Sequence, residues 1–292
     1  MKFKAVGLLS PGDMGHAVGR VLLDHGMPVV TCLEGRSERT RALAQKAGIE
    51  SVPTYGELVK ETDLILSIMV PTQVESAAKK ISHALKDTGQ RIVYADCNAV
   101  SPETVLGIEK IIREAGSCFV DVGILGPPPR EKGTTRFYAS GPDMGKFEIL
   151  MEYGLDVRVA GPMIGQASGF KMCYAALTKG TAAISTELLI AARRMGFFET
   201  MIDELQSSQS EQYSFMERFM HGMPPKSRRW IGEMEEIART FEDLGLTARI
   251  FQGAADIYRY VGETRLADET PETLDQSRTL EQVIKILAEK NQ

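Results

Sequence analysis

The first 160 residues alternate short apolar runs with segments of helical periodicity, and this alternation restricts the fold more than any other feature. The segments between the runs carry apolar residues at three- and four-residue spacing, which is typical of amphipathic helices. Alternation of this kind predicts βαβ units and a parallel sheet with helices on both faces. The predicted strands are residues 3–9, 28–33, 64–69, 92–95 and 118–122, and the predicted helices are residues 14–23, 38–47, 72–85 and 102–115.

The pattern changes after Gly161, where strand-like runs give way to helices. Before this point, residues 136–139 and 157–160 are predicted to add strands to the sheet around a short helix at 144–153. Residues 165–195 predict one long helix that is apolar around much of its girth and hence buried. Further helices are predicted at 197–206, 211–220, 226–244, 248–260 and 279–289. We therefore expect an α/β domain at 1–161 and an all-α domain at 162–292, joined by the long helix.

The composition of the 292 residues is that of a soluble globular protein, with 43% hydrophobic and 25% charged residues. A net charge of −5 suggests neither a nucleic-acid partner nor a membrane surface. The four cysteines form no C-x-x-C pair and no metal-ligand spacing, so we expect reduced thiols and no metal. No signal peptide precedes the first predicted strand. These features predict a cytoplasmic protein.

The stretch SPGDMG, residues 10–15, follows the first predicted strand and precedes the first predicted helix. A dinucleotide-binding G-x-G-x-x-G loop uses its glycines for a tight turn, for close approach to the pyrophosphate and for helix–strand packing. Ser10, Gly12 and Gly15 occupy these three places. Serine is small, and its hydroxyl can help to bind a phosphate. The context therefore predicts that α-helical amides hold a pyrophosphate here.

The end of the second predicted strand, TCLEGRSER, decides between two nicotinamide cofactors. If Glu34 faces the ribose, its carboxylate binds the 2′-hydroxyl of NAD. If Gly35 takes that place, Arg36, Ser37 and Arg39 can bind the 2′-phosphate of NADP. We favour NADP, with NAD as the alternative.

Five stretches in order resemble the β-hydroxyacid dehydrogenase family, which includes 3-hydroxyisobutyrate dehydrogenases and 6-phosphogluconate dehydrogenases. The opening is similar to V-G-x-x-G-x-G-x-M-G, and residues 69–71, MVP, are similar to the family's M-L-P loop. Residues 96–104, DCNAVSPET, are close to D-x-S-T-x-S-P-x-T. Residues 119–129 stand where the family has its D-A-P-V-S-G-G substrate loop, and residues 165–176 where it has G-x-G-x-x-x-K-x-x-N-N. The resemblance covers residues 3–195.

The resemblance implies a Rossmann-like N-terminal domain, hydride transfer between nicotinamide and a small-molecule substrate, and a homodimer built by the helical domain. The predicted cofactor-binding residues are Ser10, Pro11, Gly12, Asp13, Met14, Gly15, Glu34, Gly35, Arg36, Ser37, Met69, Val70, Pro71 and Asn98.

Lys171 is the predicted catalytic residue. It lies early on the long apolar helix, among small residues. Burial and the positive end of the helix dipole would both disfavour its ammonium form, as an acid/base lysine requires. The resemblance implies the same role, in which Lys171 exchanges a proton with the substrate oxygen.

The predicted substrate contacts depart from the family pattern. The two asparagines of K-x-x-N-N are replaced by Tyr174 and Ala175, and the S-G-G of the substrate loop is replaced by Leu125-Gly126-Pro127. The serine hydroxyl is lost, and proline offers no N–H. These changes predict a larger or less charged substrate than a small 3-hydroxy acid.

Arg228 and Arg229 begin a predicted helix beside Trp230, and they are candidates for binding a substrate anion. The alternative is a solvated basic helix start. The sequence as a whole predicts an NADP-preferring oxidoreductase acting on a hydroxy acid or related carbonyl. A reductase of C=N or other C=O bonds with the same fold, and a non-catalytic NADP(H) sensor, remain alternatives.

Overall fold

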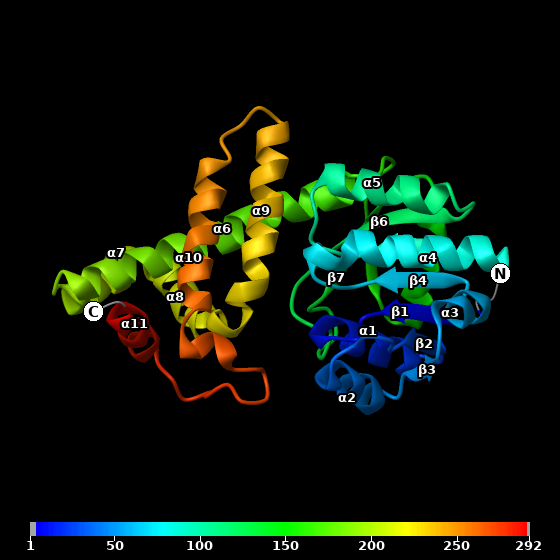
Figure 1. Cartoon of the computed structure of the whole chain (residues 1–292). Coiled ribbons are helices and arrows are strands. Elements are labelled where there is room, and N and C mark those ends of the chain that lie inside the picture. The colour runs from blue at the N-terminus through cyan, green and yellow to red at the C-terminus, as the bar shows by residue number, and fades with distance from the viewer. Residues whose placement is uncertain (1–3, 291–292) are drawn as a thin grey trace. The chain divides into compact units, whose positions relative to one another are not determined.

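The computed structural model describes residues 4–290, and Figure 1 labels most of their helices and strands. The chain divides into two compact units, Met1–Met172 and Cys173–Gln292. The division lies inside the long helix α6 (Gln166–Arg194). The domain boundary expected at residue 161 therefore stays a prediction, and each unit is described by itself.

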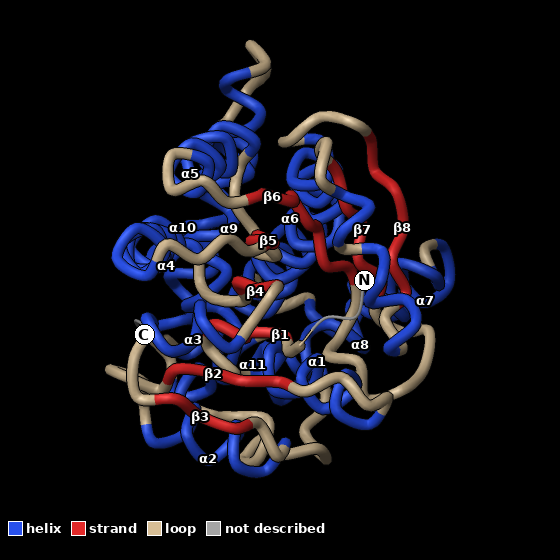
Figure 2. The backbone as a smooth tube through the Cα atoms, turned by 90° about the vertical axis from the view of Figure 1, so that its right-hand side faces the viewer, coloured by secondary structure: helices blue, strands red, loops and turns tan. Residues whose placement is uncertain are grey.

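The first unit is built on one eight-stranded sheet with the order β3-β2-β1-β4-β5-β6-β7-β8 (Figure 2). Strands β1 to β6 run parallel, β7 runs antiparallel to β6, and β8 runs parallel to β7. The order of the first six strands is that of a Rossmann fold, which confirms the predicted fold class. The strands are β1 (Val6–Leu9), β2 (Val29–Cys32), β3 (Glu50–Val52), β4 (Leu64–Ser67), β5 (Val93–Asp96), β6 (Cys118–Leu125), β7 (Arg136–Ser140) and β8 (Asp156–Gly161).

Helices cover both faces of this sheet, because the central strands are apolar on both sides. One face packs against α1 (Asp13–Asp24), α2 (Glu38–Ala47) and the 3-10 helix η3 (Glu148–Tyr153). The other packs against α3 (Tyr55–Glu61), α4 (Val74–Thr88) and α5 (Pro102–Arg113). Two shorter 3-10 helices are η1 (Pro71–Gln73) and η2 (Met144–Lys146).

Several elements differ from the sequence prediction. Strand β3 and helix α3 were not predicted, because β3 is a short edge strand with exposed side chains and α3 is brief. The helix expected at 144–153 is two 3-10 helices, η2 and η3. Strand β6 continues past Val122 to Leu125, because it pairs with β7 as an antiparallel hairpin.

The second unit is entirely helical. It contains the rest of α6, α7 (Phe198–Ser208), α8 (Ser210–Gly222), η4 (Pro224–Lys226), α9 (Ser227–Asp243), α10 (Arg249–Gly262), η5 (Arg265–Asp268) and α11 (Leu280–Glu289). Its core includes Trp230, whose ring meets Tyr258 edge-on at 5.2 Å between centroids. Within residues 4–290, no helix is both long and apolar enough to cross a membrane.

Candidate functional site

The glycine loop between β1 and α1 has the geometry of a phosphate-binding turn. Ser10 has φ of 63°, in the left-handed region that glycine usually occupies. A Cβ on Gly15 would stand 2.7 Å from the carbonyl oxygen of Ser10, so helix and loop pack closely there. A Cβ on Gly12 would meet no described atom within 4 Å, and no described side chain caps α1. The first amides of α1 are therefore open to a pyrophosphate.

The loop after β2 places Arg36 beside the segment that follows β4. Its Nη1 donates to Gln73 Oε1 at 3.2 Å, and its Nε is buried with no hydrogen-bond partner among the described residues. Gly35 has φ of 68°, and Ser37 caps α2 by accepting from the Thr40 amide. The Arg36 guanidinium group is thus half-buried and held against η1, and guanidinium groups bind phosphate well.

Two further arginines add positive charge to the same loop. Arg41 donates to the carbonyl oxygens of Leu33 at 2.8 Å and Arg36 at 3.2 Å. Arg39 forms an ion pair with Asp13, at the start of α1. The Asp13 side chain is thus turned toward α2, and the Arg39 guanidinium compensates its charge beside the phosphate site. The sequence analysis missed Arg41, because its contacts with the loop backbone depend on the fold.

Asn98 connects the ends of β4 and β5. Its Oδ1 accepts from the Met69 amide at 2.6 Å, and its Nδ2 donates to Ser67 Oγ at 2.9 Å and to Asp96 at 3.0 Å. This side chain therefore ties Met69, the first residue of the predicted Met69-Val70-Pro71 loop, to the ends of β4 and β5. Because its polar atoms are engaged in these bonds, Asn98 positions the loop, and direct contact with cofactor stays a prediction.

Asp96, at the end of β5, is a buried carboxyl group close to Lys171. Burial raises the pKa of Asp96 to about 7, hydrogen bonds from Asn98 oppose the rise, and the nearby charge of Lys171 also lowers it. Lys171 is half-buried on the second turn of α6. The predicted catalytic lysine thus lies close enough for its charge to act on a carboxyl group at the carboxyl end of β5.

Asp121 of β6 anchors the start of α6. Its carboxylate accepts from the Gly165 amide at 2.9 Å, from the Ser168 amide at 3.1 Å, from Ser168 Oγ at 2.6 Å and from Ser140 Oγ at 3.0 Å. Ser140 Oγ in turn accepts from the Ala167 amide. Amides of the first turn that lack helical partners are satisfied in this way. Burial raises the pKa of Asp121, and these hydrogen bonds oppose the rise.

Gly123 sets how closely α6 approaches the sheet. A Cβ on this residue would stand 2.8 Å from the carbonyl oxygen of Ala167 and 3.1 Å from Lys171 Cβ. Only glycine allows this approach without displacing the helix. Sequence analysis missed Asp121 and Gly123 as supports of Lys171, although both lie in the segment compared with the family's substrate loop.

The segment Leu125-Gly126-Pro127 is only partly a loop. Leu125 is the last residue of β6, pairs with Arg136 of β7 and is 4% exposed. Gly126 has φ of 106°, and a Cβ there would collide with the carbonyl oxygen of Thr134. This corrects the expectation of a loop at Leu125: the apolar run continues as a strand, and the chain turns from Gly126 onward. Contact of Leu125 and Gly126 with the substrate stays a prediction.

The predicted substrate-binding residues of the second unit differ in their exposure and in their hydrogen-bond partners. On α6, Tyr174 is 45% exposed and Ala175 is buried. Arg228 Nε donates to the carbonyl oxygen of Gly262 at 2.8 Å, and its Nη2 pairs with Asp268 at 2.7 Å. Arg229 pairs with Glu233 at 3.1 Å. Both arginines thus have partners within the helical unit, and their binding of a substrate anion stays a prediction.

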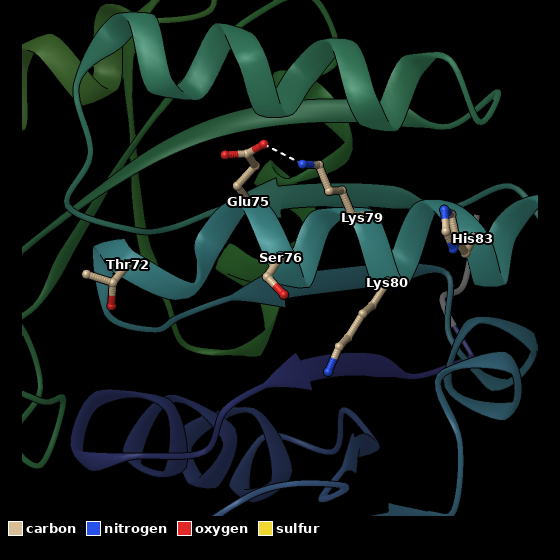
Figure 3. Close-up of a pocket in the computed structure, with 6 residues that line it drawn as sticks. All are labelled: Thr72, Glu75, Ser76, Lys79, Lys80 and His83. Atoms are coloured by element: carbon tan, nitrogen blue, oxygen red, sulfur yellow. Dashed lines mark ion pairs between the residues drawn. The ribbon is translucent and has the colours of Figure 1, made fainter.

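Two surface pockets lie beside α4. Figure 3 shows the larger, of about 430 Å³, lined by Thr72, Glu75, Ser76, Lys79, Lys80 and His83. Lys79 is paired with Glu75 at 2.6 Å, and Lys80 extends away from that pair. The smaller pocket, of about 340 Å³, is lined by Glu34 together with Lys80 and His83. Glu34 therefore shares a pocket with a lysine of α4. No metal-binding cluster of acidic, histidine or cysteine residues occurs in the described part of the chain.

The sheet order and the glycine loop define a dinucleotide-binding fold of the oxidoreductase type. Residues 5–150 match the NAD binding domain of 6-phosphogluconate dehydrogenase, and residues 192–261 match a domain of unknown function. The chain belongs to the 6-phosphogluconate dehydrogenase-like family of NAD(P)-dependent dehydrogenases, with a divergent C-terminal domain.

The similarity of this chain to its relatives extends over most of its length. An uncharacterized 28.5 kDa protein of Methanothermus fervidus is 29% identical over 259 residues, covering 88% of this chain and 99% of the relative. A conserved protein of unknown function, whose structure was described as similar to 3-hydroxyacid dehydrogenases, is 27% identical with a TM-score of 0.66; the match covers 91% of this chain and 100% of that one. Mycobacterium tuberculosis 3-hydroxyisobutyrate dehydrogenase is 16% identical with a TM-score of 0.68, covering 98% and 99%, and so shares the fold.

Proposed function

We propose that this protein transfers a hydride between NADP(H) and a CH–OH or C=O carbon of a hydroxy acid or related carbonyl compound. The observation that carries the proposal is the placement of Lys171. Asp121 anchors its helix, Gly123 brings it close to β6, and its charge acts on Asp96 at the edge where the cofactor loops meet. When bound, the nicotinamide supplies the hydride chemistry.

Lys171 would donate a proton to the substrate oxygen or accept one from it. In reduction its ammonium group donates a hydrogen bond to the carbonyl oxygen and then gives up a proton; in oxidation the neutral amine takes the hydroxyl proton. Asp121 and Gly123 act by holding the helix that bears the lysine. The test of the activity is a panel of carbonyl compounds and hydroxy acids, with NADPH and NADH absorbance followed in both directions.

A second candidate is reduction of a C=N or another C=O bond by the same machinery. It is favoured by the Leu125-Gly126-Pro127 segment, which offers neither a hydroxyl group nor a Pro127 N–H to a substrate carboxylate. Cyclic imines and uncharged ketones in the panel discriminate it from a hydroxy-acid dehydrogenase. Both candidates need a small-molecule substrate and a cytoplasmic supply of nicotinamide cofactor.

The NADP preference rests on the loop after β2, where Arg36 presents a buried Nε without a described partner. We expect Arg36→Ala to lower kcat/KM with NADPH about 10- to 100-fold, because a charge-assisted hydrogen bond contributes about 1.5–3 kcal/mol. The value with NADH should stay unchanged. Arg20→Ala, which removes an exposed arginine paired with Asp24 on α1, is the matched control. Equal losses with both cofactors would contradict the assignment of a 2′-phosphate site.

We also propose a homodimer in which an apolar stripe of α6 meets a second copy. Leu177 and Ile184 are 69% and 59% exposed, and their seven-residue spacing places them on one helix face. The double variant Leu177→Asp/Ile184→Asp is expected to be monomeric in light scattering, whereas the wild type is dimeric. Leu244→Asp, at a residue that is 67% exposed beyond α9, is the control. A monomeric wild type, or a dimeric double variant, would reject this interface.

A further inference from the structure

Cys118 and Lys146 form a close pair on the first unit, away from the cofactor loops. Lys146 Nζ lies 2.7 Å from Cys118 Sγ. Cys118 is the first residue of β6, and Lys146 is the last residue of η2. Cys118 is partly exposed and the Lys146 side chain is half exposed, so small reagents reach both.

Charged neighbours hold this pair in place. Asp143 Oδ1 accepts from Lys146 Nζ at 3.1 Å, and its Oδ2 accepts from Arg113 at 3.1 Å and from the Phe119 amide at 3.4 Å. Contact with the Cys118 sulfur, followed by contact with Asp143, raises the pKa of Lys146. The reaction of a cysteine with peroxide takes place at its sulfur, which here lies in contact with the Lys146 nitrogen.

The nitrogen–sulfur distance is short for a hydrogen bond. Amide–carbonyl hydrogen bonds have a donor–acceptor distance of about 2.9–3.0 Å, and sulfur is larger than oxygen. A separation of 2.7 Å is instead close to what two single bonds through one bridging oxygen atom would impose. Almost no movement of either side chain would be needed to insert that atom.

We propose that Cys118 and Lys146 are a redox-modification site, at which hydrogen peroxide joins the cysteine sulfur to the lysine nitrogen through one oxygen atom. First, Cys–SH and H₂O₂ give Cys–SOH and water. Then Cys–SOH, the neutral lysine amine and a second H₂O₂ give Cys–S–O–NH–Lys and two waters. One S–H and one N–H bond are lost, and an S–O and an O–N bond form.

The electrons balance in this scheme. Cysteine and lysine together lose four electrons, and the two peroxide molecules accept two each. The ammonium group first gives its proton to water at the half-exposed end of the Lys146 side chain. Four equivalents of a monothiol reverse the reaction, giving back the thiol, the amine, one water and two disulfides.

The location separates this site from the proposed hydride transfer. Cys118 lies at the amino end of β6, whereas the cofactor loops follow the carboxyl ends of the strands parallel to it. The bridge would connect the start of β6 to η2, across 28 residues of chain. Closing that loop should restrict the unfolded chain and raise the melting temperature by several degrees. The inference does not depend on the proposed function.

The test is peroxide treatment of the full-length wild type, followed by blocking of free thiols, proteolysis and mass spectrometry. The expected product is a cross-linked pair of peptides containing Cys118 and Lys146, with one oxygen gained, two hydrogens lost and release by dithiothreitol. Oxidation should also raise the melting temperature of the wild type. Lys146→Arg and Cys118→Ser should give neither the cross-link nor the rise.

Cys173 supplies a control within the same molecule, because it is an exposed cysteine on α6. Faster modification of Cys118 than of Cys173 is expected, since proximity to Lys146 and not exposure governs the reaction. Oxidation of Cys118 to sulfenic or sulfinic acid with Lys146 unmodified would overturn the proposal. So would an unreacted Cys118 beside an oxidised Cys173.

Discussion

Replacing Lys171 by methionine is expected to lower kcat by about 10²–10⁴-fold, which is the usual contribution of a general acid or base. Methionine has a similar length and no titratable group, so the helix and its packing against Gly123 should persist. The affinity for NADP(H) should be unchanged, because the proposed cofactor contacts lie in the glycine loop and the loop after β2. Turnover assays measure kcat, and fluorescence titration with the cofactor measures the affinity for NADP(H).

Controls make this result specific. Lys110→Met removes an exposed lysine from α5 and should leave kcat and the affinity for NADP(H) unchanged. Lys171→Arg retains the positive charge but cannot readily release a proton, so it should restore little turnover. A Lys171→Met protein with wild-type kcat would rule out the acid/base role. A wild type that binds NADP(H) but turns over no member of the substrate panel would favour the sensor.

Replacing Asp121 by alanine should cost about 3 kcal/mol or more in the free energy of unfolding, because each buried donor left unsatisfied costs about 1–3 kcal/mol. The carboxylate accepts from two amides and two hydroxyl groups, all of them buried. Asp121→Asn keeps the side-chain volume and one acceptor oxygen, so it should lower the free energy of unfolding less, by about 1–2 kcal/mol. Denaturant titration of both variants and the wild type measures these differences in the free energy of unfolding.

Asp121→Asn also tests whether the carboxylate positions Lys171. A shifted helix start should lower kcat by about tenfold or more, since small misplacements of catalytic groups are costly, while leaving cofactor affinity unchanged. Asp156→Asn, which breaks an exposed ion pair with Arg158, should change stability by less than about 1 kcal/mol. A stable Asp121→Asn protein with wild-type kcat would show that the anchor has no influence on the lysine.

The sequence predicted most elements of the fold because their apolar periodicity is strong. The runs that became β1, β2, β4 and β5 are buried on both faces, and the long helix was predicted within about one residue at each end. Strand β3 was missed because only pairing with β2 specifies it. The end of β6 was missed because its hairpin with β7 is a contact between segments, not a local pattern.

The candidate site was predicted less completely, for a related reason. Motif spacing located the glycine loop, and the resemblance pointed to Lys171. Motifs do not show how supporting side chains are used. Asn98 and Asp121 are each engaged by partners far away in the chain, and Arg41 folds back onto a loop backbone. Ser10 also takes a conformation that its residue type would not suggest.

Asn98 has a mechanical consequence for ligand binding. One amide side chain fastens the turn after β4 to the end of β5, so a displacement of either must pull on the other. A cofactor that displaces Met69 would thereby move Asp96, whose carboxyl group interacts with the charge of Lys171. Cofactor binding beside the ends of β4 and β5 is therefore expected to alter the protonation of the Asp96 carboxyl group.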